Sequence, residues 1–481
     1  MSKDGVTTND KQRLLDMLRP IGQEHLLAFW DRLDNEQRRR LAQQIGQIDA
    51  EMFHELKAEF GRGEAAGGDA KSKWAELAAK AEAPPAMRLE GSGVRFSPDE
   101  SRAKGAKLLK AGQVAMILVA GGLGTRLGFD QPKGLFEIGP LSQRSLFQIL
   151  LEHLLAVSRR YDVRIPLYVM TSPATDEVTR EYMSRHHWFG LPEADCRIFC
   201  QGTMWAVDAQ FERILLERLD SLFLGPDGHG GMLAGFSKSG CLADAQQRGI
   251  KHIFYGQIDN PLLQVCDELF LGSHILAGSE MTTQVVKKRD PLERVGNVVS
   301  IDGKVQVIEY SDLPEQFARQ TNADGGLKVW AGNLAVHAFA VDFLARVANQ
   351  RDALPFHTAK KKVSCLDAAG NVSEPEKPNA IRFEKFIFDL LPLAKNALVV
   401  EADAAEAFAP VKNSDEEPTD NPRLAKEAMM AQGRRQLRAA EVDVADNVAV
   451  EISPLWASTV DQIRERLHPA TRIDTATYFH I

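Results

Sequence analysis

The chain has 481 residues, of which 26% are charged and 44% are hydrophobic, and its formal net charge is −8. This length provides two or three domains with a buried core, and the composition is ordinary for a globular protein. The negative charge argues against nucleic acid as a partner, because nucleic-acid-binding domains usually carry a basic face.

Residues 1–100 are expected to form a helical N-terminal region. Between residues 9 and 60, leucine and aromatic side chains recur at spacings of three and four with charged residues between them. This period is typical of amphipathic helices. The stretch from Gly61 to Asp69 is rich in glycine and alanine and is expected to be a loop, and a helical pattern returns at residues 71–82.

The segment at residues 114–134 says most about function. Its apolar run at 114–119 is expected to be a strand. Three glycines and two fixed cations follow: Gly121, Gly122, Gly124, Arg126 and Lys133. Glycine lets backbone N–H groups approach an anion closely, because no Cβ is in the way, and arginine and lysine bind phosphate oxygens. The pattern predicts a site for the phosphates of a nucleoside triphosphate.

Two well-known nucleotide loops do not fit this segment. A P-loop needs Gly-x-x-x-x-Gly-Lys-Ser/Thr, a spacing that does not occur here. The dinucleotide fingerprint needs Gly-x-Gly-x-x-Gly, whereas after Gly124 the next glycine, Gly128, comes one residue late. This disfavours a nicotinamide-dependent dehydrogenase. From the glycines alone, a tight turn without a ligand stays an open alternative.

Residues 101–405 alternate between strand and helix patterns. The expected strands are 114–119, 166–170, 252–255, 282–287, 295–300, 305–310, 334–339 and 397–401. The expected helices are 145–159, 174–186, 209–219, 240–248, 341–349 and 380–391. Such alternation predicts an α/β fold, a mostly parallel central sheet covered on both faces. Ligands of these sheets bind beyond the carboxyl ends of the strands, where the glycine loop is expected.

Residues 406–481 are expected to form a small C-terminal α/β segment. A polar, proline-containing loop at 415–422 precedes a helical pattern at 424–440 and an apolar run at 448–452. These three elements follow the expected catalytic domain at 101–405, so the chain is predicted to have three parts in sequence order.

Further motifs occur in order along the chain: Phe199-Cys-Gln201-Gly, Pro226-Asp-Gly-His229-Gly-Gly231, Asp259-Asn260, Val295-Gly296, Ile308-Glu309-Tyr310-Ser311, Gly332-Asn333, Pro410-Val-Lys412-Asn413 and Glu451-Ile-Ser-Pro-Leu455. Together with the glycine loop they closely resemble UDP-sugar pyrophosphorylases, and most of all the eukaryotic UDP-N-acetylglucosamine pyrophosphorylases. The matches cover nearly the whole chain. The resemblance implies a Rossmann-like nucleotidyltransferase fold and an enzyme that transfers UMP from UTP to a sugar 1-phosphate.

The resemblance also implies roles for particular residues. The residues expected to be catalytic are Arg126, Lys133 and Lys412. Those expected to bind the nucleotide are Ala120, Gly121, Gly122, Gly124, Thr125, Gln201, Gly228, His229 and Gly231, with Gln201 reading the uracil edge. Those expected to bind the sugar are Gly296, Glu309, Tyr310 and Asn333.

The expected chemistry is an in-line displacement between two anions. Positioning and screening of their mutual repulsion should then supply most of the rate, as in other phosphoryl transfers. No covalent intermediate is needed. Asp259 stands at the expected end of the strand from His252, where a carboxylate can hold Mg²⁺ against phosphate oxygens, because hard cations take oxygen ligands. From the residues alone, an aspartate that caps the turn before Pro261 is the alternative, and the resemblance favours the metal role.

Two positions depart from the family pattern and leave the acceptor sugar open. The N-acetylglucosamine enzymes have asparagine where this chain has His229, whereas glucose-type enzymes carry histidine, and Ala206 stands where the family commonly has proline. N-acetylglucosamine 1-phosphate is the favoured acceptor. Glucose 1-phosphate or a broad sugar range is the alternative, and a non-catalytic sugar-nucleotide sensor is a third possibility.

The compartment and partners follow from composition. The sequence has no run near the roughly 20 apolar residues of a membrane span, and its N-terminus lacks the apolar core of a signal peptide. Its five cysteines include no Cys-x-x-Cys pair and are expected to be buried free thiols. A cytoplasmic monomer or weak homo-oligomer without nucleic-acid or membrane partners is expected.

Overall fold

The computed structural model describes residues 8–61, 74–89, 96–350 and 353–481, so the loop expected at 61–69 lies almost entirely outside the described residues. The chain divides into two compact units. The first consists of Met1–Glu76, Gly202–Gly231 and Leu354–Phe386, and the second consists of Leu77–Gln201, Met232–Ala353 and Ile387–Ile481. The predicted three-part division of the chain at residues 100 and 405 describes successive stretches of sequence and not these compact units, and it stays a prediction.

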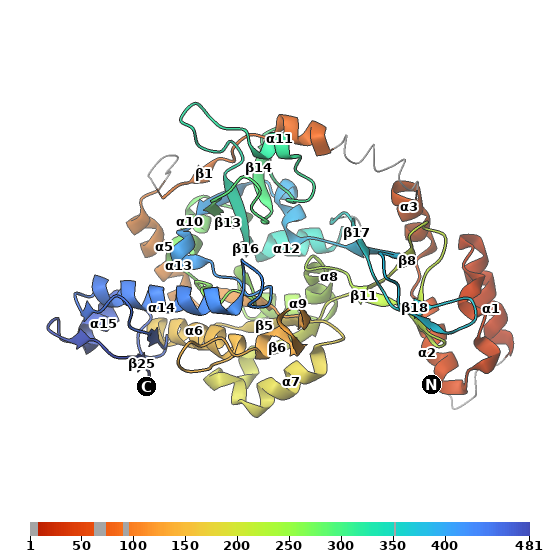
Figure 1. Cartoon of the computed structure of the whole chain (residues 1–481), viewed down its shortest axis with the longest axis horizontal. Coiled ribbons are helices and arrows are strands. Elements are labelled where there is room, and N and C mark those ends of the chain that lie inside the picture. The colour runs from red at the N-terminus through yellow and green to blue at the C-terminus, as the bar shows by residue number, and fades with distance from the viewer. Residues whose placement is uncertain (1–7, 62–73, 90–95, 351–352) are drawn as a thin grey trace. The chain divides into compact units, whose positions relative to one another are not determined.

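The first unit begins with helices, as the sequence predicted. They are α1 (Thr8–Leu18), α2 (Asn35–Ile45) and α3 (Ala50–Phe60), drawn in red in Figure 1, with short 3₁₀ turns between α1 and α2. Helix α2 starts at a capping box, in which Asp34 accepts from the backbone of Gln37 and the Gln37 side chain accepts in return. The helices bury one apolar face each, including Leu18, Leu41 and Phe53.

Short strands complete the first unit. They are β7 (Thr203–Trp205), β8 (Val207–Asp208), β9 (Leu216–Arg218), β10 (Ser221–Leu222), β11 (Leu224–Pro226), β17 (His357–Lys361), β18 (Cys365–Leu366), β19 (Val372–Ser373) and β20 (Ala380–Glu384). Strands β17, β20 and β8 form a three-stranded sheet in that order, and the others pair as β11 with β7, β10 with β9 and β18 with β19.

The helix predicted at 209–219 is wrong. Phe211 has a positive φ of 59° and Leu216 begins strand β9. The side chain of Gln23 accepts a hydrogen bond from the Ile214 N–H at 2.7 Å and donates one to the Glu212 carbonyl at 2.8 Å. These bonds replace the bonds that a helix would make, so contacts with the N-terminal helices override the helical spacing of the segment.

The helix predicted at 380–391 is also wrong. Its first half is strand β20, which pairs with β17 on one side and β8 on the other. Ile381 and Phe383 both point into the core of the first unit, which is the alternation of a strand. Residues 387–393 form a 3₁₀ helix instead of continuing an α-helix.

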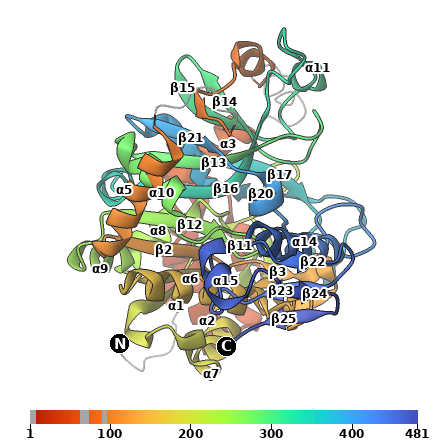
Figure 2. The ribbon, with the colours of Figure 1, turned by 90° about the vertical axis from the view of Figure 1, so that its left-hand side faces the viewer.

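The second unit contains a ten-stranded sheet. Its strands are β1 (Ala86–Met87), β2 (Val114–Val119), β5 (Leu167–Thr171), β6 (Cys196–Cys200), β12 (His252–Gln257), β13 (Met281–Lys287), β14 (Asn297–Ile301), β15 (Lys304–Ile308), β16 (Ala331–Ala340) and β21 (Ala397–Glu401). The main order is β1-β21-β13-β16-β12-β2-β5-β6, and the middle of this series is visible in Figure 2. Strand β16 is antiparallel to β12 and β13, and the other pairs in the series are parallel. The predicted mostly parallel α/β sheet is confirmed.

The second unit also contains helices. They are α5 (Pro98–Lys110), α6 (Leu146–Tyr161), α7 (Asp176–Arg185), α8 (Gly231–Lys238, whose first residue belongs to the first unit), α9 (Cys241–Gln247), α10 (Glu268–Leu276), α11 (Glu315–Ala318), α12 (Val341–Ala348) and α13 (Ala404–Ala407). Helices α5 and α10 cross at Gly105 and Gly272. A Cβ on Gly105 would lie 2.0 Å from the Glu268 carbonyl oxygen, so only glycine fits this close crossing.

The C-terminal segment has a small core of its own within the second unit. Its helices are α14 (Pro422–Ala439) and α15 (Val460–Arg466). They pack on two parallel strand pairs. One pair is β22 (Asp443–Val444) and β24 (Arg472–Ile473), and the other is β23 (Val450–Ile452) and β25 (Thr477–Phe479). Figure 1 shows it in blue, close to α6. The expected helix at 424–440 and the expected strand at 448–452 are confirmed within two residues.

Two further observations concern predictions made from composition. Among the helices in the described part of the chain, none is both long and apolar enough to cross a membrane. The five cysteines are free thiols, but they are not all buried, because Cys200 is exposed and Cys196 is half-buried. Cys196 and Cys200 lie in the edge strand β6, which has one strand neighbour, β5.

Candidate functional site

The glycine loop leaves the sheet at the carboxyl end of β2. The Val119 carbonyl accepts from the Ile258 N–H at 3.0 Å, and the Ala120 N–H donates to the Met170 carbonyl at 2.8 Å. The loop therefore starts at the meeting point of three parallel strands, β12, β2 and β5. The short strands β3 (Leu123–Gly124) and β4 (Phe129–Pro132) then form a hairpin around the turn at residues 125–127.

The three glycines of the loop have different surroundings. A Cβ on Gly124 would lie 2.8 Å from the Phe129 carbonyl oxygen, so Gly124 is required by the hairpin itself. A Cβ on Gly121 would lie 3.2 Å from Oε1 of Gln201. A Cβ on Gly122 would meet no atom within 4 Å, and its φ is not positive. The fold itself therefore does not require glycine at position 122, whereas close approach of a ligand to the backbone would require it.

Gln201, another residue predicted to bind the nucleotide, lies beside Gly121. It follows β6, is 8% exposed, and its N–H donates to the Thr171 carbonyl at 2.9 Å. Sequence reasoning missed Ser172, whose hydroxyl donates to the Gly121 carbonyl at 2.7 Å and fixes the loop from the end of β5. The only sequence signal for Ser172 is its place two residues after the strand predicted at 166–170.

Lys133 and Asp259 come together at the ends of different elements. Lys133 Nζ lies 3.8 Å from Asp259 Oδ2, with both side chains less than one-fifth exposed. The Lys133 N–H donates to the Gly122 carbonyl at 3.0 Å, which ties the lysine to the glycine loop. The next position, 134, requires glycine, because a Cβ there would lie 2.1 Å from the Phe147 ring. The Pro-Lys-Gly turn is thus fixed by packing on α6.

Lys412 joins this pair from the C-terminal part of the chain. The Val411 N–H donates to the Asp259 carbonyl at 2.8 Å, and the Lys412 N–H donates to the Asp420 carbonyl at 2.7 Å. Burial raises the pKa of the Asp420 carboxyl, the Lys412 charge opposes the rise, and the Asp259 charge adds to it. Lys133, Asp259, Lys412 and Asp420 therefore form one cluster of alternating charge, and Asp420 is a member that sequence reasoning missed.

The cluster can hold a metal only together with substrate oxygens. Within the described residues, no group of three or more His, Cys, Asp or Glu side chains is arranged to hold a metal ion. Mg²⁺ commonly uses one or two carboxylates with phosphate oxygens and water completing its shell. A carboxylate at the end of β12 fits that mode, so the donor set around Asp259 suits Mg²⁺ when a triphosphate is present.

Thr125 and Arg126 lie in the 3₁₀ turn that tops the loop hairpin. Both side chains are exposed, and Gly128 ends the turn with a left-handed φ of 69°. An exposed arginine on a short turn can meet a phosphate from solvent without breaking an internal contact.

Three of the four predicted sugar residues meet in space. A Cβ on Gly296 would lie 3.1 Å from Oε1 of Glu309 and 3.6 Å from Cβ of Asn333, and the Asn333 N–H donates to the Gly296 carbonyl at 2.8 Å. Thr283, another residue missed from the sequence, donates its hydroxyl to Asn333 Oδ1 at 3.3 Å. Tyr310 directly follows Glu309 and is 48% exposed, so it lies at the surface beside this group.

Gly228, His229 and Gly231 lie in the first unit, whereas the other predicted residues lie in the second. Gly228 has a φ of 82°, which favours glycine. The Gly231 N–H donates to the Gly228 carbonyl at 3.0 Å. The His229 ring stacks on Phe386 with 5.3 Å between centroids, and burial lowers the pKa of His229 to about 4, so the imidazole is neutral at pH 7.

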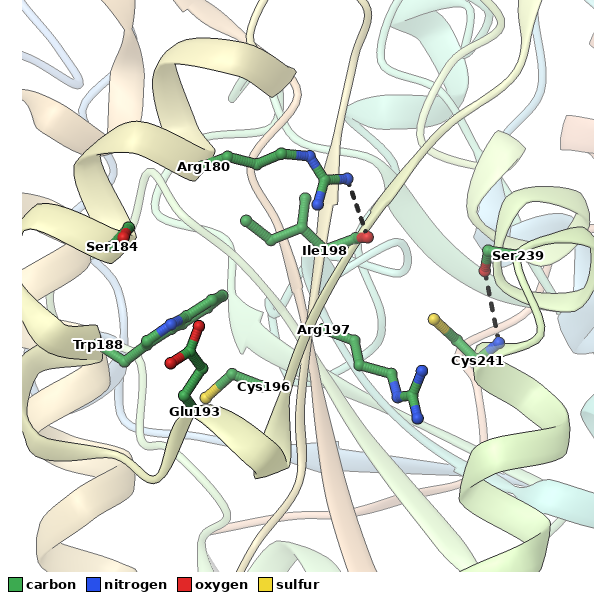
Figure 3. Close-up of a pocket in the computed structure, with 9 residues that line it drawn as sticks. All are labelled: Arg180, Ser184, Trp188, Glu193, Cys196, Arg197, Ile198, Ser239 and Cys241. Atoms are coloured by element: carbon green, nitrogen blue, oxygen red, sulfur yellow. Dashed lines mark hydrogen bonds between the residues drawn. The ribbon is translucent and has the colours of Figure 1, made fainter.

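A cavity of about 450 Å³ lies at the edge strand β6 and contains none of the predicted site residues. Figure 3 shows Arg180, Ser184 and Trp188 on one side of β6, with Ser239 and Cys241 on the other. Both arginines of this cavity are already paired with carboxylates.

Comparison with known proteins decides the family. The family model described as UTP–glucose-1-phosphate uridylyltransferase matches residues 70–476. The chain belongs to this family. The predicted enzyme class, a UTP-dependent uridylyltransferase that acts on a sugar 1-phosphate, is confirmed with it.

Named relatives support the same placement. The mouse UDP-N-acetylhexosamine pyrophosphorylase-like protein 1 is 36% identical over 429 residues, which is 87% of this chain and 83% of the relative. The Saccharomyces cerevisiae UDP-N-acetylglucosamine pyrophosphorylase is 38% identical over 357 residues, 73% of this chain and 75% of the relative. The Trypanosoma brucei UDP-N-acetylglucosamine pyrophosphorylase structure has a TM-score of 0.78 at 23% identity and covers 100% of this chain and 99% of its own. That last likeness concerns the fold, and the predicted nucleotidyltransferase fold is confirmed.

Proposed function

We propose that this uridylyltransferase uses N-acetylglucosamine 1-phosphate as its acceptor and forms UDP-N-acetylglucosamine and pyrophosphate. The observation that carries the reaction is that Lys133 contacts the Asp259 carboxylate, while Val411, the residue before Lys412, donates its N–H to the carbonyl of the same Asp259 next to the glycine loop. The names of the mouse and yeast relatives support an N-acetylhexosamine acceptor.

In the proposed reaction, a phosphate oxygen of the sugar 1-phosphate attacks the α-phosphorus of UTP. The bond from that phosphorus to the bridging oxygen of the β-phosphate breaks, and pyrophosphate leaves with the bonding electrons. Arg126, Lys133 and Lys412 reduce the repulsion between the two anions and stabilise charge in the transition state. The reaction needs no covalent enzyme intermediate.

Each substrate has a proposed set of contacts. The backbone from Ala120 to Thr125 covers the UTP phosphates, and Gln201 pairs with the uracil edge. The nucleotide-binding roles of Gly228, His229 and Gly231 stay predictions from the sequence. The group Gly296, Glu309, Tyr310 and Asn333 binds the sugar, since hydroxyls pair with carboxylate and amide groups. Asp259 holds Mg²⁺, which when bound neutralises phosphate charge.

Glucose 1-phosphate is the alternative acceptor, and His229 is the observation that favours it. The test is purified protein with UTP, Mg²⁺ and a panel of sugar 1-phosphates, followed by pyrophosphate release. We expect kcat/KM for N-acetylglucosamine 1-phosphate to exceed that for glucose 1-phosphate by at least about tenfold, a difference that one well-filled pocket supplies. Equal values would indicate a broad-range enzyme. Binding of UDP-sugar without pyrophosphate release from UTP would indicate a sensor.

The cytoplasmic location and the monomeric or weakly homo-oligomeric state stay predictions from the sequence, as does the lack of nucleic-acid and membrane partners. They are tested by fractionation of cells, by the mass of the purified protein in solution, and by binding assays with nucleic acid and lipid vesicles.

A further inference from the structure

Glu451 is a buried carboxylate that the proposed reaction does not use. It lies in β23 and is 7% exposed. Its Oε2 accepts from the backbone N–H groups of Leu141 and Ser142, both at 2.7 Å, and its Oε1 accepts from the Ser142 hydroxyl at 2.5 Å. Hydrogen bonds to a charged acceptor are stronger than neutral ones, so three of them hold this turn firmly.

The turn that Glu451 holds is the tip of a hairpin at residues 136–146. The Leu146 N–H donates to the Phe136 carbonyl at 3.0 Å, and this closes the hairpin. The Phe136 N–H donates to the Lys133 carbonyl at 3.0 Å, so the hairpin begins where the Pro-Lys-Gly turn ends. Past its other end, the Phe147 ring covers Gly134. The 136–146 hairpin is therefore tied to the Pro-Lys-Gly turn at both ends, to Lys133 at one and to Gly134 at the other.

Glu451 is connected on its other side to Lys412. The Asp420 carbonyl accepts a hydrogen bond from the backbone N–H of Lys412, and α14 begins two residues after Asp420. Helix α14 packs closely on β23, because a Cβ on Gly433 would lie 3.2 Å from Val450 Cγ1. Asp420, α14 and β23 thus form a continuous path from one lysine to Glu451, and the 136–146 hairpin continues it to the other lysine.

A second contact joins the hairpin to the C-terminal segment at the same place. The Arg144 guanidinium donates to the Ser453 hydroxyl at 3.2 Å and to the Glu152 carboxylate, and it lies 5.3 Å from the centroid of the Tyr478 ring. Ser453 and Tyr478 belong to the C-terminal segment. Both contacts restrain the same hairpin, so movement of the C-terminal segment would be transmitted to Lys133.

We propose that Glu451 is a positioning residue which, through the 136–146 hairpin, sets the separation of Lys133 and Lys412 across the reacting phosphates. This inference rests on the proposed roles of the two lysines. Phosphoryl transfer depends on placement, and a displacement of about 1 Å can reduce the rate by about 10²-fold. The C-terminal segment therefore contributes to catalysis through two residues, Lys412 directly and Glu451 through the hairpin.

The first test compares Glu451→Ala with Glu451→Gln and with Arg438→Ala in the full-length protein. The amide of Gln can still accept from the two backbone N–H groups and donate to Ser142, so it preserves most of the clamp. Arg438 pairs with Asp446 inside the C-terminal segment and does not contact the hairpin. We expect Glu451→Ala to lower kcat at least about tenfold with KM for UTP changed less than about threefold, and the other two variants to stay within about threefold of wild type.

The second test separates positioning from loss of stability. Glu451→Ala is combined with Lys133→Ala, and kcat is measured for both single variants and the double variant. If Glu451 acts through Lys133, its removal should change kcat less than about twofold once Lys133 is absent. A loss in the double variant equal to the product of the two single losses would overturn the proposal, as would wild-type kcat in Glu451→Ala.

Ser142→Ala provides the same test if Glu451→Ala does not fold. It removes one of the three hydrogen bonds and leaves the buried carboxylate in place. We expect kcat to fall by about threefold, with the same non-additivity toward Lys133→Ala. A strictly multiplicative result overturns the proposal here too. Failure of the proposed function would look different, since wild-type protein would then release no pyrophosphate with any sugar 1-phosphate.

Discussion

The ammonium nitrogen of Lys133 lies 3.8 Å from Oδ2 of Asp259, where the glycine loop meets the end of β12. The carbonyl of the same aspartate accepts from the N–H of Val411, the residue before Lys412. One aspartate therefore organises both lysines, by its side chain on one side and its backbone on the other.

Replacement of Lys133 tests the central claim of the mechanism. Lys133→Ala should lower kcat by at least about 10²-fold, the effect seen when one donor to transition-state charge is removed. Lys110→Ala, at an exposed position near the end of α5, is the control and should leave kcat unchanged. Steady-state pyrophosphate release measures both. Wild-type kcat in the Lys133 variant would remove this residue from the mechanism.

Gln201 is expected to select the base. Gln201→Ala should reduce the preference for UTP over CTP by about tenfold or more, because an unpaired base edge in a buried site costs about 1–3 kcal/mol. The ratio of kcat/KM for the two nucleotides is the measurement. Gln247→Ala, exposed at the end of α9, is the matched control. An unchanged ratio in the Gln201 variant would refute the assignment.

Gly122 separates a ligand requirement from a folding requirement. Since a Cβ at this position meets nothing within 4 Å, Gly122→Ala should leave the melting temperature within about 1 °C of wild type. It should still raise KM for UTP by about tenfold, because the methyl group would keep the phosphates from the backbone. Gly326→Ala serves as the control, at a half-buried position where an added Cβ would lie 3.2 Å from Oδ1 of the exposed Asp324 side chain. A variant with normal KM would show that the phosphates do not approach residue 122.

The metal prediction concerns Asp259. Chelation of Mg²⁺ should abolish turnover, and Asp259→Asn should raise the Mg²⁺ concentration for half-maximal rate by at least about tenfold, because an amide is a weaker ligand for a hard cation. Titration of activity with Mg²⁺ measures this, with Asp162→Asn at the exposed end of α6 for comparison. Activity that persists in chelator would exclude the proposed role.

Two buried histidines, His252 in β12 and His274 in α10, should make the fold sensitive to acid. His252 and His274 are linked by a 3.1 Å contact between ring nitrogens, and burial lowers their pKa values to about 4 and about 3. The unfolded chain binds these protons near pH 6.5, so the free energy of unfolding should fall as pH drops from 6.5 toward 4, by about 1.4 kcal/mol per pH unit for each histidine.

Urea denaturation at pH 7 and pH 5 measures this dependence. His274→Gln removes one titrating group, so the difference in unfolding free energy between the two pH values should be smaller in the variant than in wild type. An identical difference in both proteins would show that His274 does not contribute.

Much of the site could be predicted because its residues directly follow recognisable strands. The strand at 114–119 and the three glycines after it are local signals, and the structure has β2 at the same residues. Ser172, Thr283 and Asp420 were missed because each acts through one hydrogen bond or a backbone carbonyl, and serine, threonine and aspartate are common in such positions for ordinary structural reasons.

The two wrong helices show where local reasoning fails. Residues 209–219 have helical spacing, yet the side chain of Gln23 hydrogen-bonds to two backbone groups of this segment. The positive φ of Phe211 also interrupts a helix there. In β20, hydrogen bonding to a strand on each side, β17 and β8, outweighs the helical preference of the segment. In each case the competing partner lies far away in the sequence, where no periodicity within the segment can reveal it.

By itself the sequence determined the alternation of strands and helices in the second unit, the glycine loop, and the identity of the charged residues around it, because these depend on neighbours within a few positions. Only the tertiary structure decided that Lys133, Asp259 and Lys412 share one cluster and that Glu451 holds the hairpin beside it. Such contacts join residues more than a hundred positions apart, and their distances are set by how the sheet and its helices pack.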